Sequence, residues 1–350
     1  MNTKLTPYYW ESINLPNNLQ INPTNGKISG YINSNKEFKT KFNILTTVSS
    51  LPKQTSTKTF SLNVLKSKDF NNNEIISKNG IFKYATNNGR SNPQFLSKNN
   101  NFYTVYQSLD LKPEVLKYNK LEKQWTLPIK INNNSLNSNK HGHPVITIDS
   151  ENFLHIFYGA NFTEIKHVKS KIKNDISNWN QMEDIGFNSI YPSIISLPNN
   201  ELLLFNATSD KKYIFFKSSD NGQTWNEKKE IIFWGDNYFI YPDAGIIYDN
   251  DNNIIHLSWS THSYIKNDHQ GIYYAKSINN GNSWTNSNNK TLNLPINSKN
   301  TETIYFNENE ITYGESITFD ENGNPAILFT TTKKPKNLHN SIYKLAYKKK

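Results

Sequence analysis

The stretch Ser218-Ser219-Asp220-Asn221-Gly222-Gln223-Thr224-Trp225 decides the fold class that we expect for this chain. It matches the pattern Ser-x-Asp-x-Gly-x-Thr-Trp, in which the aspartate side chain caps a hairpin turn and the glycine takes a positive φ. A variant with asparagine in place of the aspartate follows at Ser277-Ile278-Asn279-Asn280-Gly281-Asn282-Ser283-Trp284. In both stretches we expect the tryptophan to pack between β-sheets, so the pattern indicates a fold rather than a function.

Both stretches lie inside a longer repeat. Five segments share a polar start, an apolar strand, a turn and a second apolar strand, and they begin at Asn92, His143, Tyr191, Tyr241 and Gly314. The first four starts are 51, 48 and 50 positions apart. A third strand follows each pair, usually with a tryptophan after it. Four strands per repeat at this period predict an all-β fold: a β-propeller over residues 69–350 with five clear repeats and five to seven blades.

Two further features concern the limits of this propeller. Degenerate blades are expected near residues 68–90 and 286–312, and residues 80–85 are the expected donor of a fourth strand to the last repeat. Residues 12–66 form a separate unit, in which Leu15-Pro16-Asn17-Asn18-Leu19 and Gly26-Lys27-Ile28-Ser29-Gly30 resemble the cadherin-like modules of bacterial surface proteins. That resemblance implies a small immunoglobulin-like β-sandwich at residues 1–68, which acts as a spacer.

Composition narrows the function classes. The formal net charge of +10 favours an acidic partner such as an anionic polysaccharide, nucleic acid or a charged cell surface. The chain has no cysteine, which excludes disulfides, a thiolate nucleophile and cysteine-bound zinc. No apolar run approaches the roughly 18 residues of a spanning helix, so membrane insertion is not expected. The first residues, MNTKLTPYYW, lack a signal-peptide pattern, although an extracellular or surface-associated location is expected.

Candidate site residues follow from the repeat. The first strand of each propeller blade lines the central channel, so residues at the start of these strands become neighbours at one mouth. Reading these positions gives a ring of histidine, tyrosine, arginine and glutamate, which suits proton transfer on an anionic sugar; its members are Arg90, Asn92, His141, His143, Tyr191, Tyr241, Tyr313 and Glu315. His262 and His269 flank a loop after the strand pair that begins at Tyr241, and His262 joins the predicted substrate-binding set.

Structural roles stand beside these functional ones. Tyr191 and Tyr241 each precede a proline, so a packed aromatic ring is as well supported there as a site residue. His143 is also compatible with a turn. His141 and His143 could bind a metal, but no carboxylate has convincing ligand spacing, so no metal site is predicted. No cofactor is predicted, and structural calcium stays open. The other strand histidines, His155, His167 and His256, are expected to be structural.

Residues 141–332 resemble the BNR-repeat, or Asp-box, family that includes the seven-bladed ulvan lyases and related rhamnosyl-uronate lyases. The stretch at residues 218–225 is the Asp-box of this family. The resemblance is carried by this box and by His141-Gly142-His143-Pro144, Leu154-His155-Ile156-Phe157-Tyr158-Gly159, Asn174-Asp175-Ile176-Ser177-Asn178-Trp179, Tyr191-Pro192-Ser193, Leu197-Pro198-Asn199, Ile255-His256-Leu257-Ser258-Trp259 and Ile272-Tyr273-Tyr274-Ala275. It implies β-elimination at a uronic acid, in which a cation neutralises the carboxylate and a histidine or tyrosine removes the C5 proton.

The resemblance also assigns roles to single positions. His141 matches the first catalytic histidine of the family. Asn161 stands where the second histidine is expected, Asn206 where a tyrosine is expected, and Lys217 where an arginine is expected. The cation is then Lys217 or Arg90 and the base Tyr191 or Tyr241, or else the site only binds.

Two functions therefore remain. The leading one is a polysaccharide lyase that cleaves uronic-acid-containing, ulvan-type glycans. The alternative is a carbohydrate-binding or adhesion propeller without turnover, on a cell or virion surface. A sialidase is excluded, because that chemistry clamps a carboxylate with three arginines and Arg90 is the only arginine. The expected partner is an acidic polysaccharide and not a nucleic acid, and the oligomeric state stays open. The predicted catalytic residues are His141, His143, Tyr191 and Tyr241, and the predicted substrate-binding residues are Arg90, Asn92, Asn161, Asn206, Lys217, His262 and Tyr313.

Overall fold

The computed structural model describes residues 8–17, 19–24, 26–30, 38–48, 54–64, 77, 93–131, 143–181, 183–226, 228–242, 245–320, 322–334 and 341–347. The chain divides into two compact units, residues 1–75 and 76–350, where the sequence predicted a boundary after residue 68. All named elements are β-strands. Within the described ranges no helix is long and apolar enough to cross a membrane.

The N-terminal unit contains two small antiparallel sheets. One has the strand order β1-β4-β5 and the other pairs β2 with β3; the strands are β1 (Tyr8–Ile13), β2 (Leu19–Ile21), β3 (Ile28–Gly30), β4 (Phe38–Val48) and β5 (Gln54–Val64). The long β4–β5 hairpin stacks Phe42 on Phe60, with ring centroids 5.7 Å apart. Gly26 has a φ of 70° and lies against the Trp10 ring, where a Cβ atom would approach to 2.7 Å. The immunoglobulin-like assignment of this unit stays a prediction.

The second unit begins with a five-stranded antiparallel sheet. It contains β6 (Phe95–Lys98), β7 (Asn101–Gln107), β8 (Pro113–Asn119), β9 (Gln124–Trp125) and β10 (Ile129–Lys130), and the last two both pair with β8. The next sheet has seven strands in chain order: β11 (Val145–Ile148), β12 (Leu154–Tyr158), β13 (Asn161–Lys169), β14 (Glu183–Ser196), β15 (Leu202–Thr208), β16 (Lys212–Ser218) and β17 (Lys229–Phe233). This sheet holds two repeats, because the first half of β14 pairs with β13 and the second half with β15.

A further seven-stranded sheet is centred on β20 and β21. Its strands are β18 (Tyr238–Tyr241), β19 (Ile246–Asp249), β20 (Ile254–Ser263), β21 (Asp268–Ser277), β22 (Trp284–Thr285), β23 (Thr291–Leu292) and β24 (Glu302–Tyr305). The last sheet contains β25 (Glu310–Phe319), β26 (Pro325–Lys333) and β27 (Ile342–Tyr347).

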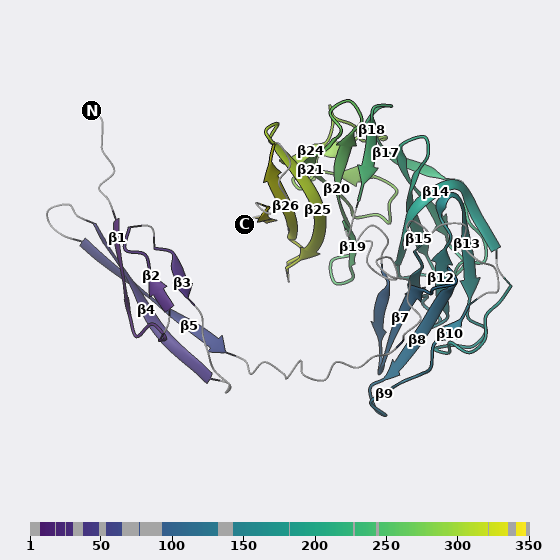
Figure 1. Ribbon diagram of the computed structural model, residues 1–350, viewed down its shortest axis with the longest axis horizontal. Coiled ribbons are helices and arrows are strands. Elements are labelled where there is room, and N and C mark those ends of the chain that lie inside the picture. Colours follow the sequence, from purple (N-terminus) through teal and green to yellow (C-terminus); the bar gives the residue numbers. More distant parts are fainter. Residues whose placement is uncertain are drawn as a thin grey trace. The chain divides into compact units, whose positions relative to one another are not determined.

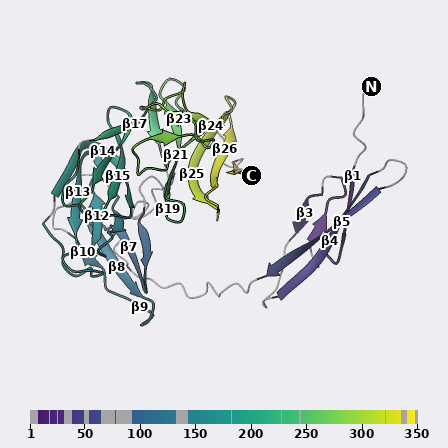
Figure 2. The same ribbon diagram turned by 180° about the vertical axis from the view of Figure 1, so that it is seen from behind.

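The predicted propeller repeat is confirmed, with β6, β11, β14, β19 and β25 as the first strands of five repeats. Figure 1 shows the sheets of this unit following one another along an arc in chain order, and Figure 2 shows them from behind. The blade expected at residues 286–312 is wrong: β23 and β24 join the sheet of β20 and β21, so this stretch forms no sheet of its own. The stretches at residues 68–90 and 80–85 lie outside the described residues, apart from Ser77.

The strands follow from the sequence pattern. The runs LHIFY in β12 and LLLFNAT in β15 are buried along their whole length, because neighbouring sheets cover both of their faces. Asparagine supplies left-handed turn conformations between strands, with positive φ at Asn99, Asn152 and Asn253. Apolar side chains pack between successive sheets, such as Tyr103 and Val105 of β7 with Ile146 and Ile156 of the next repeat.

The Asp-box has the predicted geometry. The Gly222 amide donates to Ser218 Oγ at 2.8 Å, the Thr224 amide donates to Asp220 Oδ1 at 2.9 Å, and Gly222 has a φ of 78°. Partial burial raises the pKa of Asp220, but hydrogen bonds from Thr224, Ser218 and the Gln223 amide outweigh it and lower this pKa to about 2. The Trp225 ring, which ends the box, lies edge-on to Phe157 and His167 of the preceding repeat, with centroids 5.6 and 5.9 Å away. This motif therefore joins two neighbouring repeats at one end of their strands, and the opposite end is free for a site.

Candidate active site

Two of the first strands carry the same irregularity with a tyrosine beside it, and a third tyrosine ends the strand before another first strand. In β14 the register with β15 shifts between Ile190 and Ser193, a shift that spans Tyr191. In β25 the register with β26 shifts directly after Tyr313. Tyr241 is the last residue of β18 and pairs with Ser260 of β20, and β19 pairs with the same strand from Ile246 on. β-Bulges of this kind redirect side chains and are common beside active sites.

These tyrosines belong to a continuous group of aromatic and imidazole rings, which we name the ring cluster. It consists of Tyr191, Tyr241, His262, His269 and Tyr313. The ring centroid of Tyr241 lies 6.1 Å from that of Tyr191, 6.2 Å from that of His262 and 4.7 Å from that of His269. His269 also lies 4.9 Å from His262 and 4.7 Å from Tyr313. Three consecutive repeats thus contribute to one cluster.

His269 is the centre of the ring cluster. It pairs with His262 across the β20–β21 hairpin, and the rings of Tyr241 and Tyr313 contact it from other strands. Tyr191 is only 3% exposed, whereas the other four side chains are half-buried. A neutral imidazole accepts a proton near neutral pH and a phenol can donate one, so the exposed part of the cluster has the groups for acid–base chemistry.

Two predicted asparagines lie beside Tyr191. Asn161 begins β13 and pairs with Ile190, which in turn pairs with Ala207 of β15. Asn206 is fully buried, and its amide nitrogen donates to Ser189 Oγ at 2.9 Å. The Asn206 side chain therefore supports the bulge and does not face solvent, while Asn161 is half-buried and can be reached from the surface.

Of the five remaining predicted site residues, the structure describes His143 and Lys217. His143 precedes β11 and is fully buried. Lys217 lies near the Asp-box end of β16, where its ammonium group is 2.5 Å from Glu201 Oε1. It pairs with Leu203, three positions along β15 from Asn206. His141, Arg90 and Asn92 lie outside the described residues.

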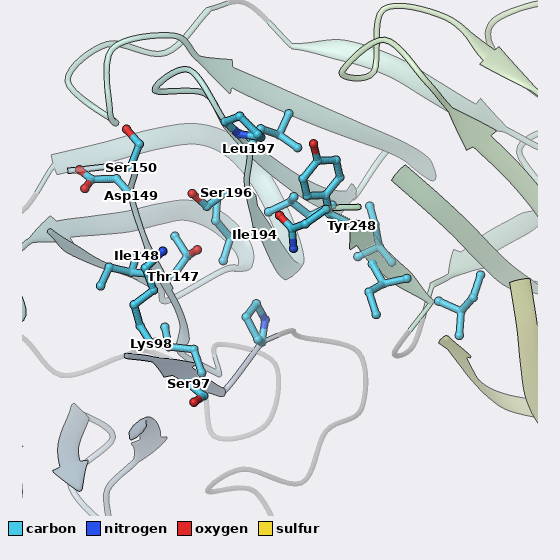
Figure 3. A pocket seen from close by; sticks show the side chains of 18 residues that line it. Ser97, Lys98, Thr147, Ile148, Asp149, Ser150, Ile194, Ser196, Leu197 and Tyr248 are labelled. Carbon is cyan, nitrogen blue, oxygen red and sulfur yellow. The ribbon is translucent and has the colours of Figure 1, made fainter. Parts of the chain in front are cut away.

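A cavity of about 700 Å³ lies further along the same first strands (Figure 3). Residues from β6, β11, β14, β19 and β25, or directly beside them, contribute to its lining. Its ionisable lining residues are Lys98, Asp149 and Tyr248. Burial raises the pKa of Asp149, but hydrogen bonds from His155, the Phe153 amide and Lys169 outweigh it and lower this pKa. The lining contains no imidazole, and its one carboxylate is buried and paired with Lys169, so the ring cluster is better equipped for proton transfer.

The strand histidines expected to be structural are buried. His155 Nε2 lies 3.1 Å from Asp149 Oδ2, and His155 Nδ1 lies 3.0 Å from His167 Nε2. Burial lowers the pKa of both imidazoles. His256 is fully buried in β20. Among the residues that the structure describes, no group of three or more histidine, cysteine, aspartate or glutamate side chains could hold a metal ion.

Comparison with known proteins identifies similar sequences. A family model described as "BNR repeat-containing family member" matches residues 101–350. An ulvan lyase of Alteromonas sp. (strain LOR) is 25% identical over 245 residues, which cover 58% of this chain and 50% of the relative. The protein "Ulvan Lyase-PL25" of Pseudoalteromonas sp. (strain PLSV) is 24% identical over 295 residues, which cover 70% and 60%. The chain thus spans about half to three-fifths of the length of these relatives.

Solved structures agree with the fold. A PL25 ulvan lyase structure has a TM-score of 0.59 and 21% identity, and the match covers 71% of this chain and 66% of that one. The structure of this lyase family bound to -[GlcA(1-4)Rha3S]- gives a TM-score of 0.61 at 20% identity, with 75% and 68% covered. At this level of identity the likeness shows a shared propeller fold.

Proposed function

The chain belongs to the BNR repeat-containing family, and on that premise we propose that it is a polysaccharide lyase acting on uronic-acid-containing, ulvan-type glycans. The observation that carries the proposal is the ring cluster, in which His269 lies between Tyr241 and Tyr313 with centroid distances of 4.7 Å to each. Relatives that are 24–25% identical to this chain are ulvan lyases, which favours the same reaction. The net charge of +10 suits a polyanionic substrate.

The reaction is a β-elimination. His269, as a neutral imidazole, accepts the C5 proton of the uronate, and the electron pair of that C–H bond forms the C4–C5 double bond. The C4–O4 bond breaks, and the phenol of Tyr241 or Tyr313 donates a proton to the departing O4. A cation beside the carboxylate stabilises the charge that develops as the C5 proton leaves. Each of the two proton transfers has a group in the ring cluster. Positioning the base and the acid on one sugar ring supplies the rate advantage.

A polymeric glycan does not cross a membrane, so this function places the protein outside the cell or on its surface. Asn161 is half-buried next to Tyr191 and can bind a neighbouring sugar. Tyr191 and Asn206 are buried, and they hold the strand irregularity that directs the exposed rings.

The test is incubation with ulvan and other acidic polysaccharides while the ultraviolet absorbance of the unsaturated uronate product is followed. Wild-type protein should form product, and His269→Gln and Tyr241→Phe should each lower kcat/KM by about 10²- to 10⁴-fold. Tyr343→Phe is the matched control, because Tyr343 is 76% exposed on β27 and outside the ring cluster. Glycan binding by wild-type protein without any product would overturn the lyase and support a carbohydrate-binding propeller instead.

A further inference from the structure

The proposed elimination needs a cation for the uronate carboxylate, and the two cations predicted from the sequence do not supply one in the described structure. Lys217 is held by Glu201 near the Asp-box end of β16. Arg90 lies outside the described residues. Histidines and tyrosines make up the ring cluster itself, so among the described residues a fixed positive charge would come from a neighbouring segment.

The turn between β15 and β16 provides such a charge. The Lys211 ammonium group lies 5.0 Å from the ring centroid of Tyr264, in the β20–β21 loop. The Tyr264 ring contacts His262 of the ring cluster, edge to face, with centroids 5.4 Å apart. Tyr264 is 51% exposed. Lys211 is therefore connected to the ring cluster through one exposed aromatic ring.

The backbone fixes Lys211 in this position. It has a φ of 62°, and its amide donates to the Thr208 carbonyl at 2.9 Å, which closes a tight turn. Its ammonium group donates to the carbonyl of Asp236. These partners, a carbonyl and an aromatic ring, orient the ammonium group without neutralising it.

Two neighbouring lysines differ from Lys211 in this respect. Lys212 forms ion pairs with Asp210 and Glu230, and Lys334 lies 2.6 Å from Asp268 Oδ2. Lys211 takes part in none of the ion pairs found among the described residues. A lysine that is held in place but keeps its full charge is suited to bind an anionic group of a ligand.

We propose that Lys211 binds and neutralises the uronate carboxylate of the substrate, with Tyr264 as the surface on which the ammonium group rests. This inference rests on the proposed function, because it takes the ring cluster as the place where the uronate binds. It assigns the specificity for a carboxylated sugar to the β15–β16 turn rather than to Lys217 at the other end of β16.

The experiment compares binding of ulvan with binding of carboxyl-reduced ulvan, which keeps its sulfate groups, by isothermal titration calorimetry. Wild-type protein should prefer the carboxylated polymer, and Lys211→Ala should lower this preference by about 10- to 100-fold, as expected for a hydrogen bond to a charged group. Lys211→Arg should retain most of it. Lys266→Ala is the matched control, because this substitution removes the same charge from an exposed residue in the β20–β21 loop, which also contains Tyr264.

Lack of preference in the wild-type protein, or an unchanged preference in Lys211→Ala, would overturn the role of Lys211. An equal loss in Lys266→Ala would also overturn it, because general attraction to the polyanion would then explain the effect. The readout is independent of turnover. If the preference depends on Lys211 but wild-type protein forms no product, the lyase is refuted and the carboxylate site is retained. If wild-type protein forms product but the preference does not depend on Lys211, the lyase is retained and the carboxylate site at Lys211 is refuted.

Discussion

Acid should destabilise this protein through one buried histidine in particular. His256 is fully buried in β20, its Nδ1 atom lies 2.7 Å from the Tyr274 hydroxyl group, and its ring stacks on Phe319 of β25 with centroids 5.6 Å apart. Burial lowers the pKa of His256 from 6.5 to about 4, with Lys276 adding to the effect and Asp249 opposing it. The folded protein therefore holds a neutral imidazole where the unfolded chain would bind a proton.

The sign and size of the effect follow from this difference. Between pH 6.5 and 4 the unfolded chain binds more protons at this position than the folded chain, so the free energy of unfolding falls as the pH falls. Above pH 6.5 the contribution is complete. One pKa unit corresponds to 1.36 kcal/mol, so the lowering of this pKa to about 4 amounts to a loss of about 3 kcal/mol at pH 4.

The assay is urea unfolding of wild-type protein and His256→Gln at pH 7 and pH 4, followed by tryptophan fluorescence. Six of the seven tryptophans lie in residues 76–350, so the signal reports on the propeller unit. The stability advantage of the wild type over the variant should shrink by about 3 kcal/mol between the two pH values. Ser258→Ala is the control in the same strand, because Ser258 is also fully buried and its hydroxyl group does not titrate in this range. An advantage that does not change with pH would refute the reasoning.

Two further predictions concern the stability of the contacts around Asp149. Lys169→Met should lower the free energy of unfolding by about 3–5 kcal/mol, because it leaves the buried Asp149 carboxylate without its cation. Lys166→Met is the control, because it removes only a surface ion pair of the same strand and should cost less than about 1 kcal/mol. Equal urea midpoints for the two variants would contradict this. Gly222→Ala should cost about 1–3 kcal/mol in the same assay, because the glycine has a φ of 78° and an added methyl group would lie 2.9 Å from the His155 ring; an unchanged midpoint would count against it.

The sequence predicted the repeat well because each repeat is defined by local chemistry. The Asp-box turns form through contacts between residues at most four positions apart, such as Ser218 with Gly222 and Asp220 with Thr224. Such contacts can be read directly from spacing. The stretch at residues 286–312 was misjudged for the opposite reason: β23 and β24 are two and four residues long, and they are strands only because β22 and β21 pair with them.

The candidate site was predicted in part. Tyr191, Tyr241 and Tyr313 come together because they occupy equivalent positions of successive repeats, and the sequence contains that information. The central position of His269 depends on the register of the β20–β21 hairpin. Ser263 pairs with Asp268 there, so His262 and His269 face each other. The two histidines are equally far from the ends of the loop in the sequence, and this spacing could have predicted that they face each other.

Strand direction separates Lys217 from the ring cluster. The resemblance to a known family offered Lys217 as one of two candidate cations, beside Arg90, because it stands where an arginine is expected before the Asp-box. In an antiparallel repeat, however, the first strand starts at the mouth that holds the ring cluster, the second strand ends there and the third starts there. The turn that contains Lys211 joins the second strand to the third, whereas Lys217 lies near the far end of the third strand. Strand order alone places Lys211 at the mouth and Lys217 away from it.

The backbone at Tyr191 connects the fold with the chemistry. A φ of 57° is rare for an aromatic residue and costs about 1–3 kcal/mol. The conformation persists because Ile190 is paired on both sides, with Asn161 and with Ala207, and because Asn206 fixes Ser189. A regular strand would point successive side chains to opposite faces of the sheet, away from the neighbouring repeat's rings. The bulge instead turns the Tyr191 ring toward Tyr241. The strained backbone at Tyr191 therefore lowers stability at one position but gives the half-exposed rings of the cluster a buried ring to pack against.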